Sequence, residues 1–211
     1  AEILSIKKHK NIKVVGCGIM STVAPIDEAS EVFLKFSKLE FILSVGHLED
    51  RKNYHSLIHA FSELTKEMPT KHLVIVGNDN GEKTKLKNLV NSLKLNSKIT
   101  MLENLTDQDL GIMYNLSQGV IFPSLYEGFG IPILETMIHQ KPLILSNINV
   151  FHEITQSHAI FFNPLSVPEI AECIKMVFMH PDKFLSNIEH GKERAKDFSF
   201  DRLAKDTKQI L

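Results

Sequence analysis

The chain has 211 residues, of which 43% are hydrophobic and 23% are charged, and its formal net charge is −1. This composition is typical of a water-soluble globular protein, and a net charge near zero excludes bulk attraction to nucleic acid or to an anionic membrane. The two cysteines, Cys17 and Cys173, match no metal-binding or redox spacing, and no apolar run approaches the length of a membrane span. We therefore expect a cytoplasmic protein with no nucleic-acid partner.

Short apolar runs that favour β-strands alternate along the chain with amphipathic stretches. The runs lie at residues 12–15, 41–46, 72–77, 98–102, 119–122, 142–146 and 159–162. They are almost continuously apolar, which is typical of strands that are buried on both faces of a sheet.

Between these runs lie segments with the apolar spacing or the start signals of helices, at 53–68, 82–95, 106–116 and 166–179. Thr106 and Asp109 have the spacing of a capping box, as do Ser166 and Glu169. Alternating strands and helices predict a Rossmann-like, doubly wound α/β domain with a mainly parallel sheet and helices on both faces.

The same pattern divides the chain into three parts. We expect residues 1–38 to be a remnant or linker from an upstream N-terminal domain together with a first helix. Residues 39–180 should form the Rossmann-like domain, and residues 181–211 should form two C-terminal helices, joined near 197–200, that pack on it.

The segment SVGHLEDRKN follows a predicted strand and begins a helix near Asn53. Ligands of open α/β sheets bind beyond the carboxyl ends of the strands, and the N–H groups of a helix start favour an anion. Arg51 and Lys52 add positive charge at the same place. On this motif alone, an anion site and a solvated basic pair are equally favoured.

The segment SLYEGFGIPILE also follows a predicted strand and begins a helix. Gly128 and Gly130 let a ligand approach the backbone amides without a Cβ in the way. Glu127 lies in the loop, and Glu135 lies one turn inside the helix with its side chain leaning back toward the loop, so both carboxylates can face one small pocket. One glutamate would be explained by the helix dipole, but two that flank GFG favour a site for a ligand with hydroxyls and a phosphate.

Taken together, these motifs resemble a known family. The chain is similar to the C-terminal, donor-binding half of the GT-B retaining glycosyltransferases of family four, the glycosyl transferases of group 1. Two glutamates with seven residues between them and an internal GFG are the family's hallmark, and PSLYEGFGIPILE matches it. The segments SVGHLEDRKN, TDQDLGIMYNLS and FNPLSVPEIAECI fit the family's phosphate loop and flanking elements, so that the resemblance covers residues 40–211.

The resemblance implies a role for individual residues. Lys52, assisted by Arg51, would bind the diphosphate, Glu127 would contact the sugar hydroxyls near the reacting centre, and Glu135 would accept hydrogen bonds from the ribose. The amides after Gly128 would hold phosphate and sugar. The implied donor-binding set is Gly46, His47, Arg51, Lys52, Asn53, Glu127, Gly128, Phe129, Gly130, Ile131 and Glu135, with Glu127, Lys52 and Arg51 as the catalytic residues.

Two positions depart from the family pattern. His47 stands where many members have an arginine, so either Arg51 carries more of the diphosphate contact or His47 is protonated beside the phosphates. Asn104 stands where a glycine is common, in the loop on the base side. His55 and His59 share a helix face, but without a third ligand they predict no metal site.

The implied reaction is transfer of a hexose from a nucleotide-diphosphate-sugar to a saccharide or lipid-linked acceptor, as in polysaccharide biosynthesis. Front-face substitution, assisted by the leaving phosphate and independent of metal or other cofactors, is the implied mechanism. The segment SVGHLEDRKN favours mannosyltransferase-like relatives and therefore GDP-mannose.

The resemblance places the acceptor site, and a peripheral association with the inner face of the membrane, on an N-terminal domain outside this sequence. We therefore expect these 211 residues to transfer no sugar alone. A non-catalytic nucleotide-sugar-binding module and half of a nucleotide-sugar epimerase are the alternatives.

Overall fold

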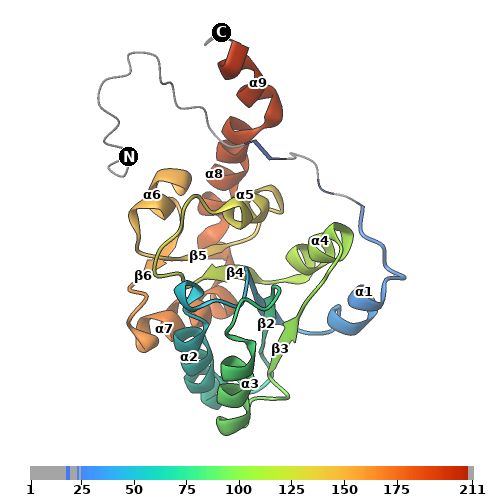
Figure 1. The fold of residues 1–211 in the computed structure, drawn as a ribbon, viewed down its shortest axis with the longest axis vertical. Helices are drawn as coiled ribbons and strands as arrows, with labels where there is room; N and C mark the ends of the chain where they lie inside the picture. The colour runs from blue at the N-terminus through green and yellow to red at the C-terminus, as the bar shows by residue number, and fades with distance from the viewer. Residues whose placement is uncertain (1–17, 20–22, 24, 209–211) are drawn as a thin grey trace.

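In the part of the chain that the structure describes, six parallel strands form one central sheet (Figure 1). The structure, a computed structural model, describes residues 18–19, 23 and 25–208. The strands are β1 (Phe41–Val45), β2 (His72–Val76), β3 (Ile99–Leu102), β4 (Gly119–Phe122), β5 (Leu143–Ser146) and β6 (Ile160–Phe162). Their order is β3-β2-β1-β4-β5-β6, and all neighbours are parallel. The predicted parallel sheet is confirmed, whereas the apolar run at 12–15 lies outside the described residues.

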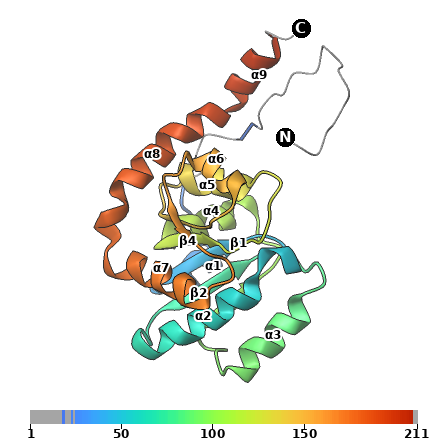
Figure 2. The same cartoon turned by 90° about the vertical axis from the view of Figure 1, so that its left-hand side faces the viewer.

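Helices cover both faces of this sheet, as Figure 2 shows. They are α1 (Glu31–Phe36), α2 (Tyr54–Glu67), α3 (Lys83–Ser92), α4 (Asp107–Leu116), α5 (Ile131–Ile138), α6 (Asn149–Thr155), α7 (Val167–Met179), α8 (Leu185–Ala195) and α9 (Phe200–Lys208). Three short 3₁₀ turns lie between them: η1 (Asp50–Lys52), η2 (Pro181–Phe184) and η3 (Lys196–Phe198). The apolar sides of α2, α3 and α7 form one core cluster, and those of α1, α4, α5 and α6 form the other.

The continuous apolar character of the strands follows from these two cores. In β1, Ile42 belongs to the core under α2 and α7, while Phe41 and Leu43 belong to the core under α4 and α5. Ser44 is also buried, and its hydroxyl donates to the carbonyl of Ile121 in β4 at 2.6 Å. A buried polar group satisfied in this way costs little stability and ties the two central strands together.

The predicted helix starts are present, but both predicted capping boxes are only half formed. In the box of Ser166 and Glu169, the Ser166 side chain accepts from the Glu169 amide, while the Glu169 carboxylate accepts from the amide of Asn163. The side chain of Thr106 accepts from the amide of Asp109 at 3.1 Å, as a capping box requires. The carboxylate of Asp109 does not bond back to the Thr106 amide, because it accepts from the hydroxyls of Thr106 and of Ser30 in front of α1. The expected box is therefore half formed, and its acidic member links α4 to α1 instead.

The C-terminal segment forms the two predicted helices, α8 and α9, joined by η3. Gly191 lets α8 approach α5 closely, because a Cβ there would lie 3.2 Å from Cγ of Met137. Figure 1 shows α9 running on beyond the sheet. In the described part of the chain, no helix combines the length and the hydropathy needed to cross a bilayer.

Candidate functional site

An open cavity of about 540 Å³ lies beyond the carboxyl ends of β1, β2 and β4. Its walls come from the loops that follow these strands, including Gly46 after β1, Gly77 after β2 and the segment 127–132 after β4. Strand succession reverses between β1 and β4, and open parallel sheets bind their ligands at such a reversal. The cavity therefore lies where the fold favours a binding site.

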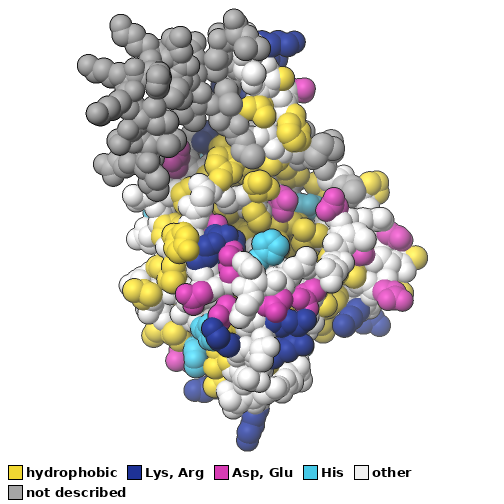
Figure 3. Space-filling model, in the orientation of Figure 1, with side chains coloured by type: hydrophobic (Ala, Val, Ile, Leu, Met, Phe, Trp, Pro, Cys, Tyr) yellow, Lys and Arg dark blue, Asp and Glu magenta, His cyan; other side chains and the backbone are white. Residues whose placement is uncertain are grey.

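The surface charge does not single out this place at a distance. On the face shown in Figure 3, basic, acidic and histidine side chains are intermixed rather than gathered in one charged patch. On this face, therefore, no single charged patch marks a site for an anion.

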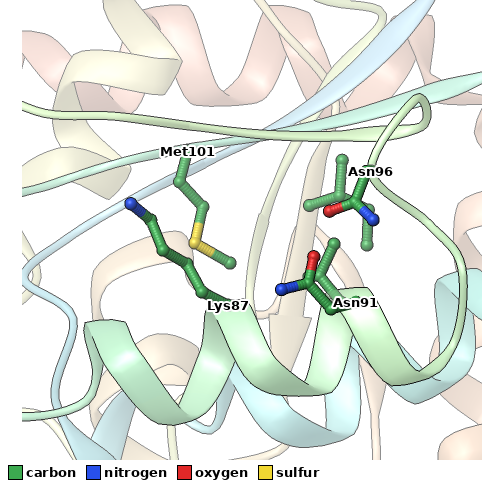
Figure 4. Close-up of a pocket in the computed structure, with 6 residues that line it drawn as sticks. Lys87, Asn91, Asn96 and Met101 are labelled. Carbon is green, nitrogen blue, oxygen red and sulfur yellow. The ribbon is translucent and has the colours of Figure 1, made fainter.

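Another hollow, of about 190 Å³, lies between α3 and β3 (Figure 4). Lys87, Asn91, Asn96 and Met101 line it together with Ile99, the first residue of β3. It lies along β3 at the edge of the sheet, away from the reversal point, and its lining residues include no carboxylate. We consider it a packing gap at the edge of the sheet.

Two glycines let the loops of the larger cavity approach each other. A Cβ on Gly77 would lie 1.9 Å from the carbonyl oxygen of Gly46, so that only glycine fits there. Gly46 itself has φ +153°, and a Cβ on it would lie 3.0 Å from Nζ of Lys52. Gly46 is expected in the site because its segment resembles the family's phosphate loop, whereas Gly77 lies in no such motif and is not predicted from the sequence.

Arg51, Lys52 and Glu127 form one ion cluster in the cavity. Nζ of Lys52 lies 2.7 Å from Oε1 of Glu127, and NH1 of Arg51 lies 2.5 Å from Oε2. The hydroxyl of Ser124 also donates to Oε1, at 2.8 Å. The side chains of Glu127 and Lys52 are only 7% and 10% exposed. The structure thus brings together the three residues predicted from the sequence as catalytic, although Glu127 lies 75 positions beyond Lys52 in the chain.

The contacts in this cluster determine whether the Glu127 carboxyl is protonated. Burial raises the pKa of Glu127, but the hydrogen bonds from Lys52, Ser124 and Arg51 and the charge of Lys52 outweigh burial and hold the pKa below its ordinary value. Glu127 is therefore ionised at neutral pH, and it carries one negative charge between two positive ones.

Arg51 has further contacts that fix its position. Its NH2 lies 2.6 Å from Oε1 of Glu49, and its guanidinium carbon lies 5.8 Å from the centre of the Tyr126 ring. Its carbonyl accepts from the amide of Leu125 at 2.8 Å. The contacts with Tyr126 and Leu125 join the loop after β1 to the loop after β4.

Asn53 does not lie in the cavity, although the resemblance implies that it belongs to the donor-binding set. It is buried with φ 55°, and its Nδ2 donates to the carbonyls of Pro123 at 3.1 Å and of Pro164 at 2.8 Å. It does not line the cavity, because the left-handed backbone turns its side chain toward the loops after β4 and β6. We therefore assign Asn53 to holding these loops together rather than to binding a ligand.

The start of α5 presents open backbone amides to the cavity. Gly130 caps the helix with φ +100°, and a Cβ on Gly128 would meet open space. Among the described residues, no acceptor takes a hydrogen bond from the amides of Phe129, Gly130 or Ile131. The Phe129 ring packs edge-on against Phe198 of η3, which supports the loop from behind. Amides at a helix start are suited to an anion.

Glu135 lines a neighbouring cavity of about 460 Å³ rather than the one that holds Glu127. The two cavities share Leu110 and Ile131 as lining residues, so they adjoin. The expected single pocket for both carboxylates is therefore divided in the structure, because Ile131 stands between the loop and the next turn of α5. Burial raises the pKa of Glu135, and Asp107 adds to the rise, while a hydrogen bond from Tyr114 opposes it.

The two positions that depart from the family pattern lie at the rim of the larger cavity. His47 is exposed there. Asn104 has φ 56°, in the left-handed region that glycine favours and that asparagine tolerates better than most residues. The asparagine can therefore take the backbone conformation of the usual glycine.

The sequence matches a known family and known proteins. The family described as "Glycosyl transferases group 1" matches residues 25–194. The serotype-specific mannosyltransferase WbdA of Escherichia coli is 33% identical over 158 residues, which is 74% of this chain and 19% of WbdA. The O-antigen chain mannosyltransferase RfbU of Salmonella typhimurium is 28% identical over 194 residues, which is 85% of this chain and 54% of RfbU. The chain thus spans about half of RfbU and a fifth of WbdA.

Solved structures share the fold. Sucrose-phosphate synthase from Thermosynechococcus elongatus has a TM-score of 0.80 at 20% identity, over 94% of this chain and 51% of its own. HepE of Anabaena, in a complex with UDP and glucose, has a TM-score of 0.76 at 19% identity, over 84% of this chain and 49% of its own. The chain belongs to the glycosyl transferases of group 1, and its fold is that of the C-terminal domain of a GT-B glycosyltransferase.

Proposed function

We propose that this chain is the donor-binding domain of a retaining hexosyltransferase, and that the larger cavity holds the diphosphate of a nucleotide-sugar. The observation that carries the proposal is the pairing of Lys52 and Arg51 with Glu127 opposite the open amides of α5. Cations and amides aimed at one point suit a diphosphate, and a carboxylate beside them suits sugar hydroxyls.

The same groups explain how the domain would assist the reaction. Negative charge builds up on the leaving diphosphate as the glycosidic bond breaks. Lys52, Arg51 and the amides of the α5 start are already oriented, so they stabilise this charge without further reorganisation. In this account the positive charge comes from side chains, so the reaction proceeds without a metal ion.

Glu135 takes the nucleoside end of the donor. Its cavity adjoins the proposed diphosphate cavity across Ile131, and we therefore place the ribose there. An ionised carboxylate accepts two ribose hydroxyls well. Glu127, in the loop, is left for the transferred sugar.

The identity of the sugar rests on the relatives. WbdA and RfbU are both named mannosyltransferases, and this supports a mannose donor, for which GDP-mannose is our proposal. RfbU is named an O-antigen chain mannosyltransferase, and this supports a saccharide or lipid-linked acceptor. The greater length of these relatives supports an acceptor site on a part of the protein outside these residues, so we expect this chain to bind donor and to transfer no sugar by itself.

A thermal-shift series with GDP-mannose, UDP-glucose, UDP-N-acetylglucosamine and ADP-glucose tests the proposal. A ligand that binds only the folded chain raises its melting temperature. We expect GDP-mannose to give the largest rise, and we expect the rise to be the same with EDTA as with magnesium. If none of the four donors shifts melting, the chain is not a donor-binding domain for these nucleotides. A shift that needs magnesium would contradict the side-chain account of the positive charge.

A further inference from the structure

In the structure, the carboxylate of Glu127 occupies the donors that a diphosphate would need. Its two oxygens accept from Lys52, Arg51 and Ser124. Ser124 is fully buried, and its hydroxyl is the third donor to the carboxylate. The site is thus already neutralised on one side by a protein group.

An entering diphosphate therefore competes with Glu127. Glycine at residue 46 leaves room beside the Lys52 ammonium, since a Cβ there would lie 3.0 Å from Nζ, and Lys52 lines the cavity that an anion would enter. Arg51 is held by Glu49 and by the Tyr126 ring. The Glu127 carboxylate is the member of the cluster that can leave, because it is on the loop before α5, where Gly128 follows it directly.

We infer that the donor diphosphate replaces the Glu127 carboxylate at Lys52 and Arg51, and that Glu127 thereby makes the site prefer a sugar-bearing nucleoside diphosphate over the free one. This inference rests on the proposed donor-binding function and assigns Glu127 a specificity role beyond its contact with the sugar.

The preference follows from what the displaced carboxylate meets. With a nucleotide-sugar, the hydroxyls of the sugar supply hydrogen-bond donors that replace the lost ones. With a free nucleoside diphosphate there are no such donors, and a side chain that is only 7% exposed would be left partly unsatisfied. The terminal phosphate also carries roughly one further negative charge at neutral pH, which the carboxylate repels. Glu127 would therefore return to the cations after transfer and promote release of the product.

Glu49 offers a matched control for the exchange. It also forms an ion pair with Arg51, at 2.6 Å, but through NH2 rather than NH1, and it does not line the cavity. Glu49→Gln and Glu127→Gln remove the same charge from the same arginine. Only the second removes an anion from the place of the diphosphate.

Calorimetric titration of GDP and of GDP-mannose into the wild type, Glu127→Gln and Glu49→Gln tests the inference, with UDP and UDP-glucose as a second pair. We expect Glu127→Gln to bind the free diphosphate about tenfold more tightly than the wild type, because a competing anion is gone. It should bind the sugar-bearing ligand no more tightly, so that the preference for the donor falls about tenfold. Glu49→Gln should change both affinities by a similar factor and leave the preference unchanged.

The proposed exchange is wrong if the wild type binds these ligands but Glu127→Gln does not bind the free diphosphate more tightly. In that case the proposed donor site is not affected. The same holds if Glu49→Gln changes the preference as much as Glu127→Gln does. If the wild type binds none of the four ligands, the proposed function fails and the exchange with it.

Glu127→Gln leaves two cations without their partner, so its thermal melting should be measured to show that the variant still folds. Added GDP should raise its melting temperature more than that of the wild type. Ser124→Ala is the second variant, since it keeps the charge and removes only the third donor to the carboxylate. We expect it to tighten GDP binding by a smaller factor, and an unchanged or weaker affinity would overturn the exchange.

Discussion

The hydroxyl of Tyr114 donates a hydrogen bond to Oε2 of Glu135 at 2.8 Å. Tyr114 is 1% exposed, and its ring stacks on His139 with 4.9 Å between the ring centres. Burial and the nearby carboxylate of Glu135 raise the pKa of Tyr114 well above its ordinary value, so it stays a donor at neutral pH. One oxygen of Glu135 is thus fixed by the core of the domain, and the other is left for a ligand.

We predict from this contact that Tyr114→Phe weakens nucleoside-diphosphate binding by about 1 kcal/mol, the usual contribution of one hydrogen bond. The binding free energy that the sugar adds should not change, because Glu135 is proposed to contact the ribose and not the sugar. Loss of the hydrogen bond also raises the pKa of Glu135 further, so binding should begin to fall at a higher pH than in the wild type. Calorimetry of GDP and GDP-mannose between pH 5 and pH 8 measures both effects. A loss confined to GDP-mannose, or an unchanged pH profile, would show that Tyr114 does not act through Glu135.

The close approach of Gly77 to Gly46 gives a prediction on stability. Gly77→Ala should lower the free energy of unfolding by about 1 to 3 kcal/mol, the usual cost of overpacking, because its Cβ would meet the Gly46 carbonyl oxygen. Gly128→Ala is the control, since a Cβ there meets open space, and its stability should stay within about 0.5 kcal/mol of the wild type. Urea unfolding measures both. Equal stability of the two variants would mean that the loops tolerate a wider separation than the structure shows.

Most of the sheet could be predicted from the sequence, because strands that are buried on both faces leave long apolar runs. The helix α6 could not: it has only seven residues, and Ile148 at its start provides no side-chain cap. Lys52, Arg51 and Glu127 could be predicted as a group, since each follows a strand whose carboxyl end lies at the same edge of the sheet.

Gly77 and Asn53 show what sequence patterns leave out. The need for glycine at residue 77 comes from a carbonyl that lies 31 residues away in the chain, and no local pattern carries that information. Asn53 follows Lys52 directly and therefore looks like a ligand-binding residue. Its left-handed backbone, which only the folded loop reveals, directs its amide to two proline carbonyls.

The two glutamates of the hallmark should respond oppositely to pH. The pKa of Glu127 is lowered, so its ionised form stabilises the fold at neutral pH, and this contribution is lost as the pH falls below about 4.3 through the folded value. The pKa of Glu135 is raised, so its protonated form stabilises the fold. This contribution to stability is fully present below about pH 4.3 and is lost as the pH rises through the pKa of Glu135 in the folded chain.

At pH 7, therefore, Glu127→Gln should lower the free energy of unfolding by about 1 to 3 kcal/mol, less than the cost of breaking a fully buried ion pair because the cluster is partly exposed. Glu135→Gln should leave the free energy unchanged or raise it, and any gain should vanish by about pH 4. Urea unfolding at the two pH values measures this. Greater destabilisation by Glu135→Gln than by Glu127→Gln at pH 7 would contradict the assigned ionisation of the site.

The central claim is that the diphosphate of a nucleotide-sugar binds at Lys52, and a pair of matched lysine variants tests it most directly. Lys71 forms a 2.7 Å ion pair with Glu40 and has a side chain that is 14% exposed, close to the values for Lys52, but it precedes β2 at the opposite edge of the sheet. Calorimetric titration of GDP should show Lys52→Ala weakened by roughly 1.5 to 3 kcal/mol, the range for hydrogen bonds to a charged group, and Lys71→Ala unchanged. Equal affinity of Lys52→Ala and the wild type, with both proteins folded, would contradict the account.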